Sequence, residues 1–319
     1  MNISLLEPLG VSEEVIEIYG KALADAGHQF TYYQEKAEDV EELKRRTAGQ
    51  DIVMIANHPY PDEVIRSADR LKMIAVAFTG VDHVGREACR EKGILVCNCA
   101  GYSNESVAEL AVGMVLGLYR KIVEADGLVR DGGTNLGMAG REIAGKTVGI
   151  VGCGKIGYRT AKLFQAFGAK VLVNELQAKE EWKAEGLEAT DLDAVMARSD
   201  IISIHLPLCQ ATRGLIGREK IALMKETAIL VNCARGPIID NEALAEALSE
   251  KRIAGAAIDV YDMEPPIPED YPLLHAPNTL FTPHVAFLTE EAMVRRAKIE
   301  FDNVQAYLAG KPQNICDTM

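Results

Sequence analysis

The sequence lacks the cysteine spacings that would indicate a disulfide framework or a zinc site. It has seven cysteines, an odd number, and none of them belongs to a CxxC pair. Free thiols in a reducing compartment fit this pattern better than disulfides do. Cys97 and Cys99 would project from one face of a strand, but no second pair nearby would complete a zinc site. We therefore expect core thiols and no metal.

The sequence also lacks the features that bind nucleic acids or membranes. The formal net charge is −13, and the longest basic run covers only residues 44–46. The longest nearly apolar run, residues 107–119, is too short to cross a bilayer. The first ten residues have neither a basic segment nor a long apolar one, so we expect no signal peptide. These absences predict a cytoplasmic protein with neither nucleic acid nor membrane as its main partner.

A βαβ pattern with a glycine-rich turn occupies residues 147–175, TVGIVGCGKIGYRTAKLFQAFGAKVLVNE. Gly152 permits the tight turn, Gly154 lets the backbone approach a pyrophosphate, and Gly157 lets the helix pack closely on the strand. Unpaired N–H groups at the start of the helix would bind the phosphates. The complete order of strand, turn, helix, second strand and terminal acid predicts a dinucleotide site. The alternative is a purely structural βαβ unit.

Glu175 ends the second strand of this pattern and favours NAD over NADP. A carboxylate at this position would bind the adenosine ribose diol and repel a 2′-phosphate. Residues 176–179 contain no Arg that would attract the phosphate, although Lys179 could reach one. We therefore expect NAD as the cofactor.

The first hundred residues alternate short β-type runs with helical patterns, which predicts an α/β domain with a parallel sheet. Strands are expected at residues 3–6, 29–33, 52–56, 73–77 and 95–98, and helices at residues 12–26, 40–46, 61–68 and 86–91. No glycine fingerprint follows the first strand. This domain should therefore lack a nucleotide site of its own.

A second α/β domain follows, and the chain then returns to the first. Beyond the glycine-rich pattern, strands are expected at residues 201–204, 228–231, 256–258 and 279–281, and helices at residues 192–197, 218–224 and 241–249. A final helix at residues 290–308 is too long for a connector and should pack on the first domain. The predicted domains are residues 1–101 with 287–319, for the substrate, and residues 102–286, for NAD. Both should be doubly wound parallel sheets of Rossmann-like or flavodoxin-like type, with the chemistry in a cleft between them.

One long helix is expected at residues 103–129, where the second domain begins. Its centre, ELAVGMVLGLY, is apolar nearly all round, which indicates burial on more than one side. Gly113 and Gly117 are four residues apart and would let another backbone approach closely. The helix is either buried within its own subunit or forms the interface of a two-fold homodimer, which we favour.

Three strands of the second domain end in polar residues that could carry out chemistry. Arg235 offers a planar fork suited to a carboxylate, and it follows the second of the later strands. Asp259 and Glu264 follow the third strand, and His284 follows the fourth. A carboxylate partner such as Glu264 would orient His284 and favour its charged form. Taken singly, Arg235 would more often be a surface residue and Glu264 a loop residue, and His284 would be structural as often as catalytic. Together, on the sheet edge that holds a dinucleotide, they predict hydride transfer to a 2-oxo acid.

The chain resembles the D-isomer-specific 2-hydroxyacid dehydrogenases along almost its whole length. The motifs that carry the resemblance are GYSNESVAEL, VGIVGCGKIG, ISIHLPL, VNCARGPIID, AAIDVYDMEP and FTPHVA. It implies that Arg235 binds and polarises the substrate's carboxylate and carbonyl groups. It also implies that His284, paired with Glu264, is the catalytic acid or base.

The resemblance implies a set of cofactor contacts as well. Asp259 would bind the carboxamide side of the nicotinamide. His205 would lie beside the cofactor, although on sequence alone it would more often be a core histidine. The expected cofactor-binding residues are Gly152, Gly154, Lys155, Ile156, Gly157, Glu175, His205, Pro207, Thr212, Cys233, Arg235, Asp259 and His284.

The resemblance places the substrate's carboxylate on backbone groups of Phe78, Thr79 and Gly80. Relatives that act on phosphorylated or D-lactate-like substrates often carry Arg in this loop, and this chain has none there. His58 and Tyr60 are further candidates for contact with the substrate's side chain.

The sequence therefore predicts an NAD-dependent D-2-hydroxyacid dehydrogenase that reduces a small, non-phosphorylated 2-oxo acid of the hydroxypyruvate or glyoxylate type. Two alternatives stay open. One is an NAD(H)-sensing binding protein, as in the dehydrogenase-like transcriptional corepressors, although nothing here resembles a peptide-binding extension. The other is a phosphoglycerate dehydrogenase.

Overall fold

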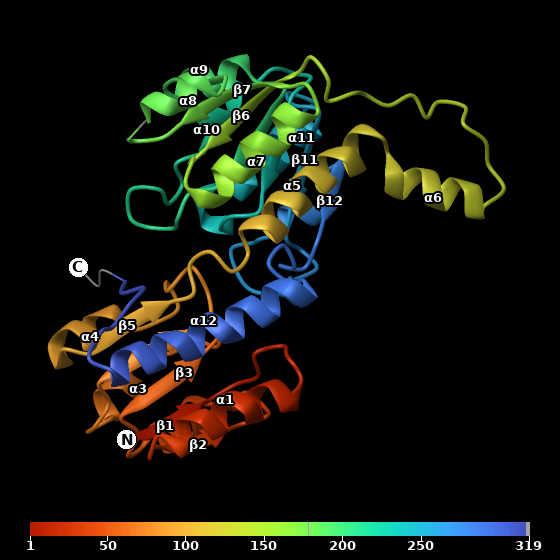
Figure 1. Cartoon of the computed structure of the whole chain (residues 1–319). Coiled ribbons are helices and arrows are strands. Elements are labelled where there is room, and N and C mark those ends of the chain that lie inside the picture. The colour runs from red at the N-terminus through yellow and green to blue at the C-terminus, as the bar shows by residue number, and fades with distance from the viewer. Residues whose placement is uncertain (178, 317–319) are drawn as a thin grey trace. The chain divides into compact units, whose positions relative to one another are not determined.

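The chain folds into two compact units, each built around one parallel sheet, in a computed structural model that describes residues 1–177 and 179–316 (Figure 1). Unit 1 comprises Met1–Ser103 and Leu288–Met319, and unit 2 comprises Asn104–Phe287. Every strand pair in both sheets is parallel, which confirms the predicted α/β class.

Unit 1 has a five-stranded sheet in the order β2-β1-β3-β4-β5. Its strands are β1 (Asn2–Leu5), β2 (Gln29–Tyr32), β3 (Ile52–Ile55), β4 (Met73–Val76) and β5 (Leu95–Asn98). Its helices are α1 (Glu13–Asp25), α2 (Val40–Thr47), α3 (Asp62–Ser67), α4 (Arg86–Lys92) and α12 (Glu290–Leu308). This is the flavodoxin-like order, in which the chain changes direction across the sheet between β1 and β3.

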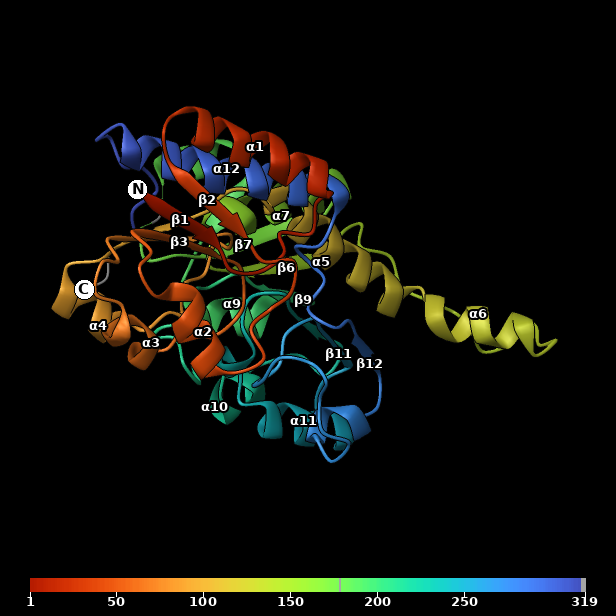
Figure 2. The ribbon, with the colours of Figure 1, turned by 90° about the horizontal axis from the view of Figure 1, so that it is seen from below.

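Both faces of the unit 1 sheet are covered by helices. All residues of β3 and β4 are buried, as expected for central strands of a parallel sheet. Helices α1 and α12 lie side by side on one face, where Tyr19 stacks on Phe301 with ring centroids 4.7 Å apart. Helices α2, α3 and α4 lie on the other face (Figure 2).

Unit 2 has a seven-stranded sheet in the order β12-β11-β10-β9-β6-β7-β8. Its strands are β6 (Thr147–Val151), β7 (Lys170–Asn174), β8 (Leu187–Ala189), β9 (Ile201–Ile204), β10 (Ile229–Asn232), β11 (Gly255–Ile258) and β12 (Thr279–Phe281). Its α-helices are α5 (Asn104–Tyr119), α6 (Ile122–Arg130), α7 (Lys155–Ala166), α8 (Glu180–Ala184), α9 (Leu192–Arg198), α10 (Arg218–Ala222) and α11 (Asn241–Ser249), and two 3₁₀ turns cover Gly236–Ile238 and Pro272–His275. This is the Rossmann order, with its change of direction between β6 and β9.

The prediction of a single helix at residues 103–129 is wrong, because this segment forms two helices, α5 and α6. Lys121 lies between the two helices with φ of 51°, a left-handed conformation that ends an α-helix. The carbonyl of Tyr119 accepts a hydrogen bond from the N–H of Arg141 at 2.8 Å, in place of the N–H one turn further along the helix. Within unit 2, α5 is largely buried, whereas no residue of α6 is buried and α6 extends away from the sheet (Figures 1 and 2).

Of the two glycines of α5, Gly117 packs within its own subunit, whereas Gly113 is exposed and a Cβ there would meet no atom within 4 Å. A Cβ at Gly117 would lie 2.7 Å from the side chain of Leu280 in β12. This glycine therefore allows close packing of α5 on the sheet of its own subunit. Elsewhere, α8 and β8 were not predicted, since a three-residue edge strand is too short to show a hydrophobic pattern. Across residues 1–177 and 179–316, none of the helices has the length and hydrophobicity needed to cross a membrane.

Candidate active site

The glycine-rich turn connects β6 to α7 and is held by steric constraints that only glycine meets. Gly152 has φ of 88°, and a Cβ there would lie 2.8 Å from the backbone of His205. A Cβ at Gly157 would lie 2.0 Å from the carbonyl oxygen of Gly152. A Cβ at Gly154 would meet nothing within 4 Å, so the space beside this residue is open. The turn thus leaves room for a group that approaches the backbone at the start of α7, where Lys155 and Ile156 begin the helix.

Glu175 follows β7 and holds the glycine-rich turn from the side. One carboxylate oxygen accepts a hydrogen bond from the N–H of Cys153 at 2.9 Å, and the other accepts one from the N–H of Leu176 at 2.9 Å. The same residue lines a cavity of about 530 Å³. The cavity is lined by Cys153, Gly154, Lys155, Tyr158, Glu175, Leu176, Gln177, Lys179, Glu181, Trp182 and Glu185. A cavity that begins at a glycine-rich turn and has a carboxylate on its wall fits the adenosine end of a dinucleotide. Ala178, in the segment used to argue for NAD, lies outside the described residues.

The loop after β9 contributes His205, Pro207 and Thr212. The ring of His205 bonds through Nε2 to the hydroxyl of Ser203 at 2.9 Å, and burial lowers the pKa of this histidine to about 4. It is therefore a neutral imidazole at neutral pH. The hydroxyl of Thr212 donates to the carbonyl of Pro207 at 2.7 Å, which closes the loop on itself.

Arg235 lies in a turn that a buried asparagine holds in place. Asn232 ends β10 and is fully buried. Its side-chain amide donates to the carbonyl of Arg235 at 2.9 Å, and its oxygen accepts from the N–H of Ala234 at 3.0 Å. In the same turn, burial raises the pKa of Cys233 well above its ordinary value, and the thiol donates to the sulfur of Met114 at 3.8 Å. Cys233 is thus a packing residue in its thiol form, and Arg235 is the polar group that the turn presents.

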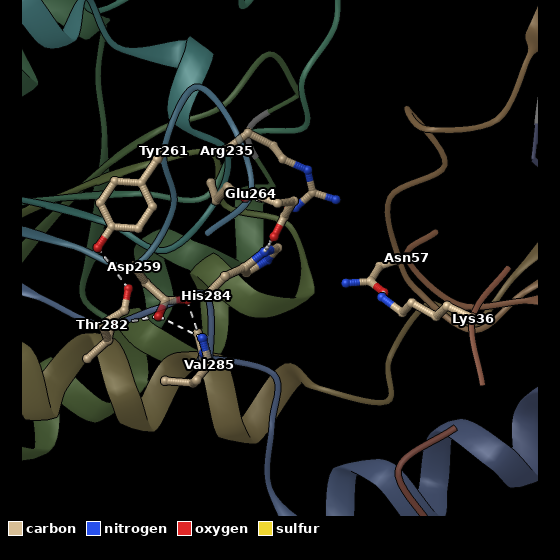
Figure 3. Close-up of polar contacts among 11 residues, drawn as sticks. Lys36, Asn57, Arg235, Asp259, Tyr261, Glu264, Thr282, His284 and Val285 are labelled. Carbon is tan, nitrogen blue, oxygen red and sulfur yellow. Dashed lines mark hydrogen bonds and ion pairs between the residues drawn. The ribbon is translucent and has the colours of Figure 1, made fainter. Parts of the chain in front are cut away.

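His284 and Glu264 form a direct pair. The Nδ1 atom of His284 lies 2.8 Å from one carboxylate oxygen of Glu264 and 3.0 Å from the other. His284 has φ of 57°, and its ring packs edge-on against Phe287 with centroids 5.4 Å apart. Figure 3 shows the side chains of Arg235, Glu264 and His284 directed toward one another at the carboxyl ends of β10, β11 and β12. With Nδ1 engaged by Glu264, Nε2 is the nitrogen left to exchange a proton with a ligand.

Asp259 fixes the backbone on which His284 lies. This carboxylate is fully buried at the end of β11. One oxygen accepts hydrogen bonds from the hydroxyl of Thr282 at 2.6 Å and the N–H of Val285 at 2.9 Å, and the other accepts from the N–H of Ala286 at 3.0 Å (Figure 3). The carbonyl of Asp259 accepts from the N–H of His284 at 2.9 Å. This bracing role was not expected from the sequence; the contact with nicotinamide stays a prediction.

The loop expected to bind the substrate's carboxylate follows β4 in unit 1. Its carbonyl groups are engaged, since Thr79 accepts from the side chain of Asn98 at 2.7 Å and Phe78 accepts from the N–H of Cys99 at 2.9 Å. The N–H groups of Thr79 and Gly80 donate to no other residue that the structure describes. Phe78 is buried, and the guanidinium of Arg296 lies 5.1 Å from its ring centroid. The hydrogen bonds to its carbonyl groups therefore hold the loop in place, and the N–H groups of Thr79 and Gly80 are available to bind a ligand.

His58 and Tyr60 in unit 1 were further candidates for contact with the substrate, and the prediction for Tyr60 is wrong. Its side chain is fully buried, and its hydroxyl bonds to that of Thr47 at 2.9 Å, so it does not face a ligand. His58 is partly exposed, and burial lowers its pKa from the ordinary value. Asn57 precedes His58 and lies at the same strand end, where the sequence predicts ligand binding. The sequence reasoning did not connect Asn57 with Glu7 and Lys36, which follow two other strands and are brought to it by the fold.

The site contains no arrangement that suggests a metal. In the part of the chain that the structure describes, no group of three or more His, Cys, Asp or Glu residues is placed to hold an ion.

Comparison with known proteins agrees with this geometry. Residues 112–286 match the family model described as D-isomer specific 2-hydroxyacid dehydrogenase, NAD binding domain. The chain is 39% identical over 281 residues to a glyoxylate reductase of Thermofilum pendens, covering 85% of this chain and 82% of that protein. It is 38% identical over 300 residues to a glycerate dehydrogenase of Methylorubrum extorquens, covering 91% and 92%. The solved structure of an acyclic imino acid reductase in complex with NADPH and D-Arg is similar with a TM-score of 0.90 and 28% identity, covering 99% of this chain and 100% of that one.

Proposed function

The chain belongs to the family of D-isomer specific 2-hydroxyacid dehydrogenases, NAD(P)-dependent oxidoreductases that act on CH–OH groups, and from this premise we propose its particular reaction. The proposed reaction is the NADH-dependent reduction of a small, non-phosphorylated 2-oxo acid to the D-2-hydroxy acid. The observation that carries the proposal is the His284–Glu264 pair beside Arg235, at the sheet edge that also bears the glycine-rich turn.

The proposed roles follow from the chemistry of each side chain. A bound nicotinamide supplies the hydride. The guanidinium of Arg235 binds the substrate's carboxylate and stabilises the negative charge that develops on the carbonyl oxygen. Nε2 of His284 donates a proton to that oxygen, and Glu264 holds the ring in place and stabilises its charged form through Nδ1. Asp259 keeps the His284 segment fixed during this step.

The proposed cofactor is NAD, bound in unit 2. Glu175 supports this choice because its carboxylate lines the cavity and would bind a ribose diol. The proposed contacts, besides the glycine-rich turn and Glu175, are His205, Pro207, Thr212, Cys233, Arg235, Asp259 and His284. The substrate's carboxylate would also bind the N–H groups of the loop formed by Phe78, Thr79 and Gly80 in unit 1. That loop has no Arg, which disfavours a phosphorylated substrate.

The proposed assembly is a homodimer formed through α6. Ile122, Val123 and Val129 on this helix have exposed fractions of 53%, 64% and 72%, and Leu136 in the following loop is 89% exposed. A nine-residue helix that buries none of its residues gains little stability by itself, so a partner surface would be needed to hold it. A two-fold axis would supply the same surface from a second copy.

A screen of 2-oxo acids with NADH and with NADPH, followed by absorbance, tests the proposed reaction. We expect turnover of glyoxylate or hydroxypyruvate with NADH, and a loss of about 10² to 10⁴ in kcat for His284→Gln. His275→Gln is the matched control, since His275 lies in a 3₁₀ turn and its ring bonds to the carbonyl of Glu269 at 2.7 Å, away from the His284–Glu264 pair. The absence of turnover with every 2-oxo acid would refute the proposed reaction and favour an NAD(H)-sensing binding protein. Full activity in His284→Gln would refute the proposed role of His284 as the proton donor.

A further inference from the structure

A group of polar side chains lies at the carboxyl edge of the five-stranded sheet, where the strand order changes direction between β1 and β3. In open α/β sheets, ligands bind beyond the carboxyl ends of the strands at such a point. Glu7 follows β1, Lys36 follows β2 and Asn57 follows β3. The loop of residues 78–80 follows β4, the strand next to β3. These residues come from four adjacent strands of one sheet.

Glu7 is the fixed element of this group. Its side chain is 1% exposed. One carboxylate oxygen accepts hydrogen bonds from the N–H groups of Ala56 at 2.7 Å and His58 at 3.0 Å, so it holds the backbone on both sides of Asn57. The other oxygen lies 3.7 Å from the ammonium of Lys36. A buried carboxylate thus joins the ends of β1 and β3 and pairs with a lysine.

The contact between Lys36 and Asn57 determines which way the amide of Asn57 points. The ammonium of Lys36 donates to the side-chain oxygen of Asn57 at 2.7 Å. An ammonium group has donors only, so the amide oxygen must face it and the NH₂ group must point away. Figure 3 shows this orientation, with the nitrogen of Asn57 directed away from Lys36. That NH₂ group donates to no other residue in the described ranges 1–177 and 179–316.

We propose that Lys36 and Asn57 form a subsite for a hydroxyl group on the third carbon of the 2-oxo acid. The inference rests on the proposed function and names its substrate class as 3-hydroxy-2-oxo acids. The NH₂ group of Asn57 donates to the oxygen of this hydroxyl, and Lys36 holds the amide in the donating orientation. The substrate's carboxylate binds the neighbouring N–H groups of Thr79 and Gly80, so that its third carbon is directed toward β3.

The charge at the subsite selects a neutral group over an anionic one. Lys36 is half-exposed and its charge is offset by the buried carboxylate of Glu7, so the pair carries no net charge. A second carboxylate or a phosphate on the substrate would lose its hydration and gain no net positive charge there. A methyl group would leave the amide donor of Asn57 unpaired, which also costs free energy. A hydroxyl is the substituent that satisfies both conditions.

The test uses the full-length protein and NADH, and it compares kcat/KM for hydroxypyruvate, pyruvate and oxaloacetate. These three acids differ in the group on the third carbon. We expect the wild type to prefer hydroxypyruvate over pyruvate by about tenfold or more, the size of one neutral hydrogen bond. Asn57→Leu should reduce this ratio to near unity. Lys36→Met should reduce it as well, because the amide is then free to rotate. Lys21→Met is the matched control, since Lys21 is an exposed lysine paired with Asp25 at 3.0 Å, and it should leave the ratio unchanged.

The outcomes separate this inference from the function on which it rests. Absence of turnover with any 2-oxo acid would refute the proposed function itself. Turnover with an unchanged ratio in both Asn57→Leu and Lys36→Met, each shown to be folded by thermal unfolding, would refute the subsite alone. A preference of the wild type for oxaloacetate or for pyruvate over hydroxypyruvate would refute it too.

Discussion

Nδ1 of His284 lies 2.8 Å from one oxygen of Glu264 and 3.0 Å from the other, so the imidazole is held by both oxygens of one carboxylate. The histidine side chain is 15% exposed and the glutamate side chain is 62% exposed, so solvent reaches the pair mainly from the Glu264 side. The carboxylate therefore fixes which nitrogen carries the hydrogen bond and leaves Nε2 for the substrate. This relationship connects the fold to the proposed proton transfer.

Replacing Glu264 by Gln keeps a hydrogen-bond acceptor and removes the charge. Because the carboxylate is hydrogen-bonded to Nδ1 of His284 and would offset the positive charge of a proton-donating imidazole, we expect kcat for 2-oxo acid reduction at pH 7 to fall by at least about tenfold. Steady-state assays with NADH measure the effect, with Glu269→Gln as the control in the same loop. An unchanged kcat would show that Glu264 has no part in proton transfer.

Glu175 supports the glycine-rich turn and would also repel a 2′-phosphate, and different substitutions can separate these two roles. Glu175→Gln keeps an oxygen that can accept from the N–H of Cys153 but removes the negative charge. We expect the ratio of kcat/KM for NADPH over NADH to rise on the order of tenfold, since repulsion of a 2′-phosphate is lost. Glu175→Ala also removes the support of the glycine-rich turn, so KM should rise for both cofactors. The proposed preference for NAD would be wrong if neither variant changed the ratio.

The sequence predicted the positions of the catalytic candidates at strand ends because each follows a short apolar run that indicates a buried strand. Arg235, Glu264 and His284 come from three such strand ends, and parallel strands bring their carboxyl ends to one edge. The parallel, doubly wound type of both sheets could also be predicted, since alternation of strands and helices restricts the topology to a few arrangements.

Features that depend on contacts between distant segments could not be read from the sequence. The break between α5 and α6 depends on the N–H of Arg141 reaching the carbonyl of Tyr119, and nothing local marks it. The group of Glu7, Lys36 and Asn57 depends on which strands become neighbours. Tyr60 was a candidate for contact with the substrate because it follows a strand, but its side chain is buried in the core and its hydroxyl bonds to that of Thr47.

Glu300 in α12 should make the stability of the protein depend on pH. It is fully buried, its two oxygens have no hydrogen-bond partner among the described residues, and burial raises its pKa well above 4.5 although Arg296 opposes this. The folded state therefore keeps a proton that the unfolded state loses above pH 4.5, so the carboxyl reduces stability as the pH rises.

We expect Glu300→Gln to raise the Tm by a few degrees at pH 8, with the gain shrinking toward pH 4 as both states of the wild type become protonated. Thermal unfolding followed by circular dichroism across this range measures the difference. Glu17→Gln, at an exposed position on α1, is the control and should show no such trend. A variant less stable than the wild type at every pH would mean that Glu300 is charged and paired with Arg296.

The exposed apolar residues of α6 give the proposed dimer a direct test. In a two-fold interface, one substitution places a charged side chain on both copies of the chain. Both charges lose their hydration when the dimer forms, so the substitution strongly weakens association. We expect the wild type to have twice the chain mass of 34.7 kDa in multi-angle light scattering, and Val129→Glu to have the mass of one chain. Val294→Glu is the control, because Val294 is 54% exposed on α12, and it should stay dimeric. A wild type with the mass of one chain at micromolar concentration, or a dimer that survives Val129→Glu combined with Ile122→Glu, would rule out α6 as the interface.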